Sequence, residues 1–280
     1  MNIRAYAKIN LSLDIVSKRE DGYHDLKTVM HRVNLFDELS FEKNGSGNSR
    51  IITENRNVPK DGKNIIIKTI DKFYSYTGLP REGFDIYLKK NIPVCAGLGG
   101  GSADSAATLK YINEYYESPL SESELGLIGS SIGADVPFCL KGGTCLCEGI
   151  GEIITPLSPL PECDIVIAKP AANGLSTAKI FSLADLSKMK YHPDTDGLIS
   201  ALEAGDILNV CKRVFNVLEI YSVPECKEIE LFKNILIDSG ADAASMSGSG
   251  SAVFGIFTNE SSAKEAFDRL SKMTPEVFIV

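Results

Sequence analysis

The stretch from Ile92 to Ala107 reads IPVCAGLGGGSADSAA, and the rest of this chain is organised around it. Its glycine-rich part, Gly97–Ser102, carries almost no side chains, so main-chain N–H groups can converge there on a ligand. Alanines and small polar residues follow at once and predict a helix with Ser102 as its N-cap. A strand-like segment, Asp85–Leu88, precedes the loop. A strand, a glycine loop and a helix in this order predict a phosphate site at a positive helix terminus.

A glycine-rich loop can also be a flexible turn before a surface helix, and the loop alone leaves this alternative open. The standard phosphate-binding fingerprints are absent from it. No Gly-Lys-Ser/Thr follows at P-loop spacing, and Ser102 stands where a dinucleotide fold has its third glycine. The signatures of protein kinases are absent too. The loop is therefore expected to bind phosphate in another way.

The composition is typical of a soluble globular protein of one large or two modest domains. The chain has 280 residues, of which 44% are hydrophobic and 24% are charged. Its net charge of −8 argues against a nucleic-acid-binding surface, which would need a basic face. An anionic ligand must therefore be held by local amides and a few well-placed lysines.

The cysteines and the N-terminus predict a cytoplasmic protein. Seven cysteines without paired spacing indicate reduced thiols and not a disulfide framework. Cys145 and Cys147 have no nearby histidines or second cysteine pair, so we expect no protein-bound metal site. No signal-peptide pattern and no apolar run of membrane-spanning length is present, so we expect no membrane partner.

Apolar residues at every second position from 5 to 15 predict a half-buried first strand. Lys8 and Asn10 share its polar face, where a solvated lysine is the ordinary interpretation. A turn at Asp21–His24 then presents Tyr23 and His24 together. From the residues alone, such a pair is more often structural than functional.

Further elements follow in the first half. Residues 29–41 are expected to form a strand, and residues 64–76 a helix whose N-cap is Asn64. Residues 121–132 predict a second helix with a capping box. Asp135 follows among apolar neighbours and next to a proline, where a carboxylate is costly unless it is paired. Lys8 is a candidate partner for it, and structural capping is the alternative.

In the second half the pattern restarts after a cluster of prolines, and we place a domain boundary at residues 157/158. A small-residue loop at 246–251 leads into the last strand, helix and strand. This half is expected to be an α+β sandwich. The sequence predicts a strand over 164–168, helices over 176–188, 206–221 and 225–239, a strand over 252–257 and a helix over 261–272.

Four pieces together resemble the GHMP family of small-molecule kinases over essentially the whole chain. Each piece alone is weak, and the set in this order is specific. Cys95 stands where relatives usually have glycine. The pieces are YAKINLSL (6–13) with DGYHDL (21–26), GLGGGS (97–102), GADVPF (133–138) with GGT (142–144), and MSGSGSAVFG (246–255).

The resemblance implies an α+β, two-domain GHMP kinase fold. Its N-terminal domain (1–157) would resemble ribosomal protein S5 domain 2 and carry ATP and the catalytic groups. Its C-terminal domain (158–280) would be a ferredoxin-like α/β sandwich that contributes to the substrate site. The implied reaction transfers phosphate from ATP, with Mg²⁺, to an alcohol of the non-mevalonate isoprenoid pathway, cytidine diphosphate methylerythritol. The protein would act as a monomer or a homodimer.

The resemblance also implies the roles of individual residues. Asp135 would be the catalytic base, with Lys8 beside the reacting hydroxyl, and Phe181 would sandwich the cytosine opposite Tyr23. The nucleotide residues would be Asn64, Lys90, Pro93, Ala96, Gly97, Leu98, Gly99, Gly100, Gly101 and Ser102. The substrate residues would be Asn10, Tyr23, His24, Asp135, Thr177 and Phe181.

Two alternatives remain open. A sister kinase for another alcohol, such as mevalonate or homoserine, would keep Asp135 and the loop without needing Tyr23 and His24. A silent sensor on the same fold would bind ATP and sugar without turnover, and the presence of both Lys8 and Asp135 argues against it.

Overall fold

The computed structural model describes residues 2–171 and 174–280. Contacts between residues divide the chain into two compact units. Unit 1 contains the chain up to residue 7 together with residues 34–94 and 99–142, and unit 2 contains residues 8–33, 95–98 and 143–280. Each unit thus combines segments that are far apart in the sequence. The single boundary expected at 157/158 stays a prediction.

The first two strands are the longest in the described part of the chain, and each contributes residues to both units. Every second residue from 5 to 15 is buried, as the apolar alternation predicts. The polar face differs from the expectation of a half-buried strand, because Lys8, Asn10 and Ser12 are buried as well. A solvated Lys8 is therefore excluded. These strands are β1 (Asn2–Lys18) and β2 (His24–Lys43).

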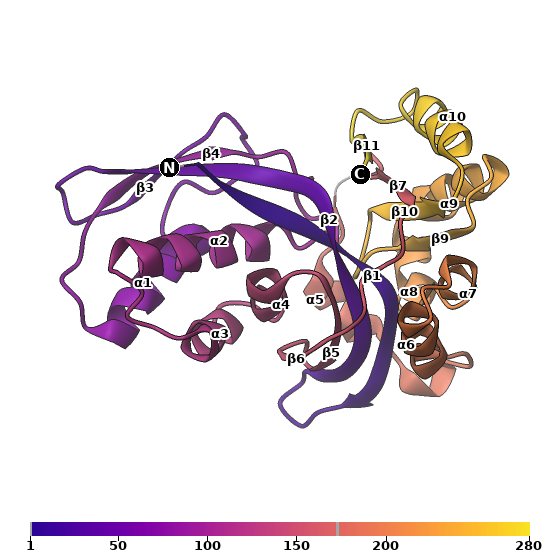
Figure 1. Cartoon of the computed structure of the whole chain (residues 1–280), viewed down its shortest axis with the longest axis horizontal. Helices are drawn as coiled ribbons and strands as arrows, with labels where there is room; N and C mark the ends of the chain where they lie inside the picture. The colour runs from indigo at the N-terminus through magenta and orange to yellow at the C-terminus, as the bar shows by residue number, and fades with distance from the viewer. Residues whose placement is uncertain (1, 172–173) are drawn as a thin grey trace. The chain divides into compact units, whose positions relative to one another are not determined.

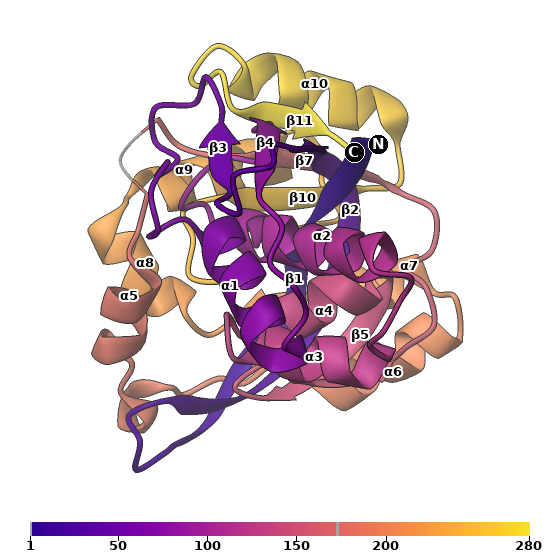
Figure 2. The same cartoon turned by 90° about the vertical axis from the view of Figure 1, so that its left-hand side faces the viewer.

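In unit 1, β4 pairs antiparallel with β2 and parallel with β3. Its four helices lie together on one face of these strands (Figures 1 and 2). Asn64 caps the first helix and Ser121 forms a capping box with Glu124, as expected. Helix α4 was not expected. The elements of this unit are β3 (Arg50–Ile52), α1 (Ile65–Thr77), β4 (Phe84–Lys89), α2 (Gly100–Tyr115), α3 (Glu122–Ser130) and α4 (Val136–Lys141).

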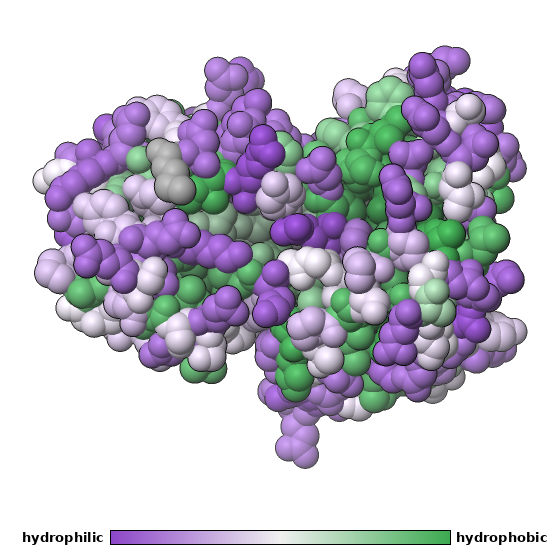
Figure 3. All heavy atoms as spheres, viewed as in Figure 1, coloured by the Kyte–Doolittle hydropathy of each residue, from purple (hydrophilic) through white to green (hydrophobic). Residues whose placement is uncertain are grey.

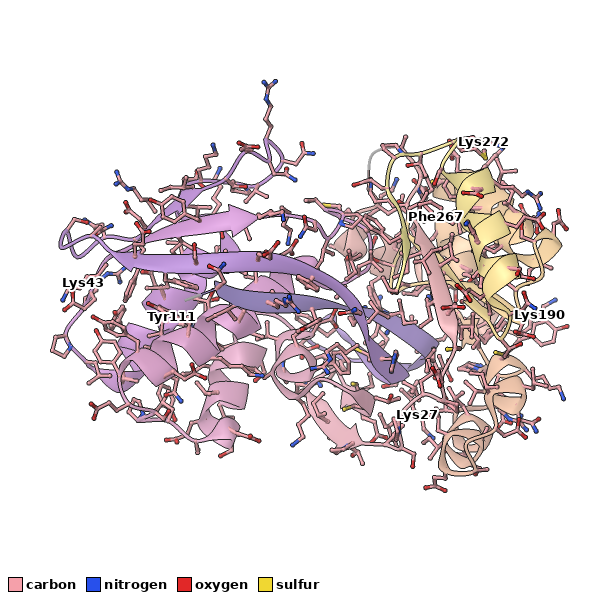
Figure 4. All side chains as sticks on the ribbon, turned by 45° about the horizontal axis from the view of Figure 1, so that its top comes forward. Lys27, Lys43, Tyr111, Lys190, Phe267 and Lys272 are labelled. Atoms are coloured by element: carbon pink, nitrogen blue, oxygen red, sulfur yellow. The ribbon has the colours of Figure 1, made fainter. Side chains whose placement is uncertain are left out.

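Aromatic rings join α2 to the sheet in unit 1. Tyr111 lies on the side of α2 that faces the strands (Figure 4), and its ring stacks on Phe41 with 4.0 Å between centroids. The edge of Phe84 meets the same ring at 5.9 Å. Such pairs contribute beyond the area they bury, so they hold the helix that follows the glycine loop against its sheet.

Unit 2 contains an antiparallel sheet of order β11-β7-β10-β9, against which α9 and α10 pack (Figure 1). Buried side chains between these layers form its core. The strands of this unit are β5 (Thr144–Gly149), β6 (Ile153–Pro156), β7 (Asp164–Ala168), β8 (Phe215–Asn216), β9 (Ala243–Met246), β10 (Val253–Phe257) and β11 (Val277–Ile279). The helices are α5 (Thr177–Leu183), a 3₁₀ turn (Leu186–Lys188), α6 (Thr195–Glu203), α7 (Ile207–Cys211), α8 (Glu219–Glu225), α9 (Glu228–Asp238) and α10 (Glu260–Leu270).

The helix expected over 206–221 is wrong. The chain there forms α7, then the short strand β8, then α8. The break has a tertiary cause, because β8 pairs with β1 and the side chain of Asn216 bonds to main-chain carbonyls of a distant loop. The helix expected over 176–188 also ends early, at Leu183, before the 3₁₀ turn.

The surface in Figure 3 is largely hydrophilic, with apolar residues gathered near β11 in unit 2. Ile279 on that strand is exposed. Among the described helices, none combines the length and the apolar character that crossing a membrane would require.

Candidate active site

The glycine loop enters α2 differently from the sequence-based expectation. Gly99, at a left-handed φ of 70°, is the N-cap, and the helix begins at Gly100. Ser102 therefore lies inside the first turn, and its expected N-cap role is wrong. No side chain of the described residues caps this helix. Its first N–H groups are left for water or a ligand, which is the arrangement that binds phosphate elsewhere.

The preceding part of the loop, Cys95–Leu98, is bound within unit 2. Cys95 has a left-handed φ of 54°, which explains why glycine suits this position. The main-chain oxygen of Ala96 accepts a hydrogen bond from the N–H of Ala252 at 3.0 Å. A Cβ built on Gly97 would lie 2.1 Å from the main-chain oxygen of Ser247, so only glycine fits there. Leu98 and Ala96 are buried.

The side chain of Lys90 is almost fully buried in unit 1, next to the start of α2. Its Nζ donates to Asp37 and, at 2.7 Å, to Asp104. A Cβ built on Gly100 would lie 3.1 Å from the same Nζ, so the ammonium group lies directly beside the glycine loop. Asp37 also accepts hydrogen bonds from the main-chain N–H groups of Asn91 and Ile92, which fixes the chain before Pro93.

Two carboxylates share this one cation, and the pKa values reflect it. Burial raises the pKa of Asp104 to about 8, with Lys90 opposing the shift and Asp37 adding to it. Burial lowers the pKa of Lys90, but its attraction to Asp104 and Asp37 outweighs this effect and raises the pKa. The cluster thus consists of two carboxyl groups around one buried ammonium group. The pattern of the sequence gave no signal for Asp37 or Asp104.

The side chain of Asn64 is used inside unit 1. Its Oδ1 accepts from the N–H of Ile66 at 2.8 Å, and its Nδ2 donates to the main-chain oxygen of Pro59 at 2.6 Å. The expected N-cap role is confirmed. Asn64 is also buried, and both of its side-chain polar atoms have partners inside unit 1. Its contact with the nucleotide stays a prediction.

Asp135 occupies the N-cap position of α4, but its side chain makes no capping hydrogen bond. The capping alternative is therefore wrong. The carboxylate is half-buried, and its turn lies beside the start of α2, because a Cβ on Gly133 would lie 3.5 Å from Oγ of Ser102. Within unit 1, a carboxylate thus comes near the end of α2 that is expected to hold phosphate.

Lys8 and Asn10 are joined in a buried chain of hydrogen bonds in unit 2. Nζ of Lys8 donates to Oδ1 of Asn10 at 2.6 Å, and Nδ2 of Asn10 donates to Oγ1 of Thr28 at 2.8 Å. Thr28 in turn donates to the main-chain oxygen of Ser12 at 2.5 Å. The main-chain N–H of Lys8 donates to the oxygen of Leu98 at 3.0 Å. The ammonium group is therefore held in place by Asn10. Thr28, which the sequence did not indicate, supports these two candidate residues.

The structure brings His24 and Phe181 together in unit 2. Their ring centroids are 5.7 Å apart, whereas Tyr23 is exposed. Burial, with a smaller contribution from Lys18, lowers the pKa of His24, so the ring is neutral at pH 7 and can both donate and accept. Its buried Nε2 has no hydrogen-bond partner among the described residues.

Thr177, which begins α5, shares a hydrogen bond of 2.9 Å with Ser249.

Two family profiles match the chain. The profile for the GHMP kinases N terminal domain matches residues 64–143, and the profile for the GHMP kinases C terminal domain matches residues 198–276. Each match lies within one of the two halves that the sequence indicates.

Curated relatives match the whole chain. The 4-diphosphocytidyl-2-C-methyl-D-erythritol kinase of Caldicellulosiruptor bescii is 45% identical over 279 residues, which cover 100% of this chain and 97% of the relative. The protein of the same name from Clostridium kluyveri is 44% identical and is covered to 99%.

Solved structures agree with these relatives. The crystal structure of a 4-(cytidine 5'-diphospho)-2C-methyl-D-erythritol kinase matches with a TM-score of 0.82 and 28% identity, covering 100% of this chain and 98% of that one. The homoserine kinase of Cytophaga hutchinsonii matches with a TM-score of 0.74 at 19% identity, covering 99% and 94%, and shows the fold alone. The expected two-domain GHMP kinase fold is confirmed, and use of ATP follows from the kinase family. The chain therefore belongs to the GHMP kinases, a family of phosphotransferases, and within it to the 4-diphosphocytidyl-2-C-methyl-D-erythritol kinases.

Proposed function

We propose that this protein uses ATP to phosphorylate the 2-hydroxyl of 4-(cytidine 5'-diphospho)-2-C-methyl-D-erythritol, a step in the non-mevalonate route to isoprenoid precursors. The observation that carries the proposal is full-length identity of 45% to a relative with this name. The paired rings of His24 and Phe181 support it, because a cytosine needs a flat apolar face and a polar edge reader.

The proposed ATP site is the uncapped start of α2 with the glycine loop before it. Amide N–H groups and the positive end of the helix suit an anion, and Gly99, Gly100 and Gly101 add no side chain that would cover them. The side chain of Lys90, held by Asp37 and Asp104, lies beside Gly100 of this loop. This arrangement needs no overall positive charge, which agrees with a chain whose net charge is −8.

The residues of this chain would share the proton and the charge of the reaction. The substrate oxygen attacks the γ-phosphorus, the bond from that phosphorus to the bridging oxygen of ADP breaks, and Asp135 accepts the proton of the hydroxyl. Lys8 would stabilise the developing negative charge on the attacking oxygen. The hydrogen bond to Asn10 keeps Lys8 in place.

We further propose that Mg²⁺ accompanies ATP. This ion binds oxygen ligands and is usually held by substrate phosphates with one or two carboxylates. In unit 1 the hydroxyl of Ser102, in the first turn of α2, is an oxygen donor of the fitting kind, and the phosphates of ATP would supply further ligands. The ion would neutralise charge on the phosphates when bound. We also propose a cytoplasmic location, which agrees with the seven free thiols. The protein would act there as a monomer or a homodimer.

A panel of acceptors tests the substrate. Release of ADP is measured with the cytidine diphosphate alcohol, with mevalonate and with homoserine, each at several concentrations. We expect kcat/KM for the cytidine compound to exceed the others by at least about a thousandfold, because a site that reads a base edge rejects analogues without it. A higher value for mevalonate or homoserine would contradict the proposed substrate while leaving the kinase family intact.

A further inference from the structure

The loop formed by residues 246–251 contacts the expected nucleotide and catalytic residues of unit 2. Oγ of Ser247 donates to the main-chain oxygen of Gly97 at 2.9 Å. A Cβ built on Gly248 would lie 3.2 Å from Nζ of Lys8 and 3.0 Å from the oxygen of Gly97. The backbone of this loop at Gly248 thus lies beside both the Lys8 ammonium group and Gly97 of the glycine loop.

The same loop also contacts the expected substrate residue of α5. The hydroxyl groups of Ser249 and Thr177 are 2.9 Å apart and hydrogen-bonded. On the inner side, Oγ of Ser222 donates to the main-chain oxygen of Ser249 at 3.1 Å. A shift of the 246–251 loop would therefore move contacts to nucleotide, catalytic and substrate residues at once.

One buried side chain holds this loop from behind. Asn216 is 2% exposed, and its Nδ2 donates to the main-chain oxygens of Met246 and Gly248, at 2.8 Å each. Its Oδ1 accepts from the N–H of Leu218 at 2.9 Å, so the bonding network fixes which end of the amide carries the donors. Both carbonyls that flank Ser247 are thereby held by a single amide.

Asn216 is itself fixed relative to the strand that carries Lys8. It lies in β8, which pairs parallel with β1 through Ser12 and Leu13. Lys8 and Asn10 lie on the same strand a few residues earlier. The amide therefore connects the strand of the catalytic lysine to the loop that lies against its ammonium group.

We propose that Asn216 is a positioning residue of the phosphoryl transfer. It holds the 246–251 loop, and thereby keeps the Lys8 ammonium group and Gly97 of the glycine loop in the positions that the reaction requires. This inference rests on the proposed function and adds a residue to it. The loop needs such a support, because Gly248 and Gly250 have left-handed φ values of 56° and 83° and glycine backbone is permissive. Small misplacements of catalytic groups cost rate even when binding survives.

The test compares two isosteric substitutions. Asn216→Asp replaces the donors to two carbonyls by a carboxylate oxygen that repels them. Asn113→Asp is the matched control, because Asn113 is also a buried asparagine bonded to backbone, through the N–H and oxygen of Leu120, in unit 1 at the far end of α2. Both variants should lose thermal stability. Only Asn216→Asp should lose kcat, by about tenfold to a hundredfold.

The pH profile provides a readout that a merely structural role would not change. A buried carboxyl group has a raised pKa, and its protonated form can donate one hydrogen bond. The ratio of kcat for Asn216→Asp to kcat for the unmodified protein should therefore rise as pH falls from 8 to 6. If the aspartate variant does not fold, Asn216→Ser keeps one donor and should show a smaller loss of kcat.

Failure of this inference is distinguishable from failure of the proposed function. An unmodified protein that ignores the cytidine diphosphate alcohol refutes the function, and the variants are then compared on whichever alcohol it phosphorylates. Affinity for ATP is measured in parallel without any acceptor, and it should fall several-fold in Asn216→Asp because Ser247 contacts Gly97. A folded Asn216→Asp with normal kcat, KM and ATP affinity would overturn the inference.

Discussion

At the scale of single residues, the expected site contains side chains that already have partners inside the protein. Lys90 is bound by Asp37 and Asp104, and Asn64 by the backbone of α1 and of the preceding loop. Their contribution to ATP binding is therefore expected to be indirect, through the chain segments that they hold. Asp135 lies at the N-cap position of α4, and its side chain makes no capping hydrogen bond there.

Asp135→Asn should keep the fold and ATP binding and lower kcat by about a hundredfold or more, the usual effect of removing a positioned general base. The substitution removes the proton acceptor with little change in shape. Steady-state kinetics with the cytidine diphosphate alcohol measure it. Asp206→Asn is the control, because Asp206 is an N-cap of α7 and asparagine caps equally well. Turnover close to normal in Asp135→Asn would remove Asp135 from the mechanism.

Phe181→Ala should weaken binding of the cytidine diphosphate alcohol by about 1 to 3 kcal/mol, the range for a base stacked on an aromatic ring. Affinity for ATP should not change. Phe267→Ala is the matched control, because Phe267 (labelled in Figure 4) is also a partly buried phenylalanine packed on the core of unit 2. Calorimetric titration with each ligand separates the effects. Weaker ATP binding with normal alcohol binding would assign Phe181 to the wrong ligand.

At the scale of elements, local patterns in the sequence predicted strands and capped helices well. The alternation of β1, the cap of α1 and the capping box of α3 depend on neighbours within a few residues, and each is confirmed. Features set by distant contacts were not predictable. The burial of the polar face of β1 depends on elements that pack over it, and the break of the helix expected over 206–221 depends on the bonds of Asn216 to a loop thirty residues later.

The start of α2 shows the same limit. Several small residues could serve as the N-cap, and only the left-handed conformation of Gly99 decides that the helix begins two residues before Ser102. The same limit applies to Lys90. Its partners Asp37 and Asp104 lie far from it in the sequence, and no sequence pattern predicts that these charged residues pair. The roles of Lys8, Asp135 and the cytidine residues came from the resemblance to a family, and no local pattern indicates them.

Gly99→Val should weaken ATP binding at least tenfold, because valine resists the left-handed conformation and would reorient the first turn of α2. Gly78→Val is the matched control. Gly78 has nearly the same φ, 68° against 70°, and ends α1 in the same unit with no atom within 4 Å of an added Cβ. Both variants should lose similar thermal stability, and only Gly99→Val should lose ATP affinity. Equal ATP affinity in the two variants would mean that the loop is only a turn.

At the scale of the whole molecule, an acidic chain is expected to bind two anionic ligands through local groups. Its net charge is −8, and the proposed phosphate site consists of main-chain amides and the N-terminus of α2. The 246–251 loop is hydrogen-bonded both to Gly97 and to Thr177, so one segment of unit 2 contacts residues proposed for each of the two ligands. The overall class of the fold was predictable from the order of strands, helices and small-residue loops, whereas the interleaving of the two units was not.

The central claim is tested most directly by the product formed when the cytidine diphosphate alcohol is the sole acceptor. The purified chain is incubated with this alcohol, ATP and Mg²⁺, and phosphorus NMR follows ADP and the new phosphate ester. We predict one phosphorylated alcohol for each ADP, with the ester at the 2-hydroxyl, and almost no product with Asp135→Asn. ADP without a phosphorylated alcohol, or an ester at another hydroxyl, would contradict the claim.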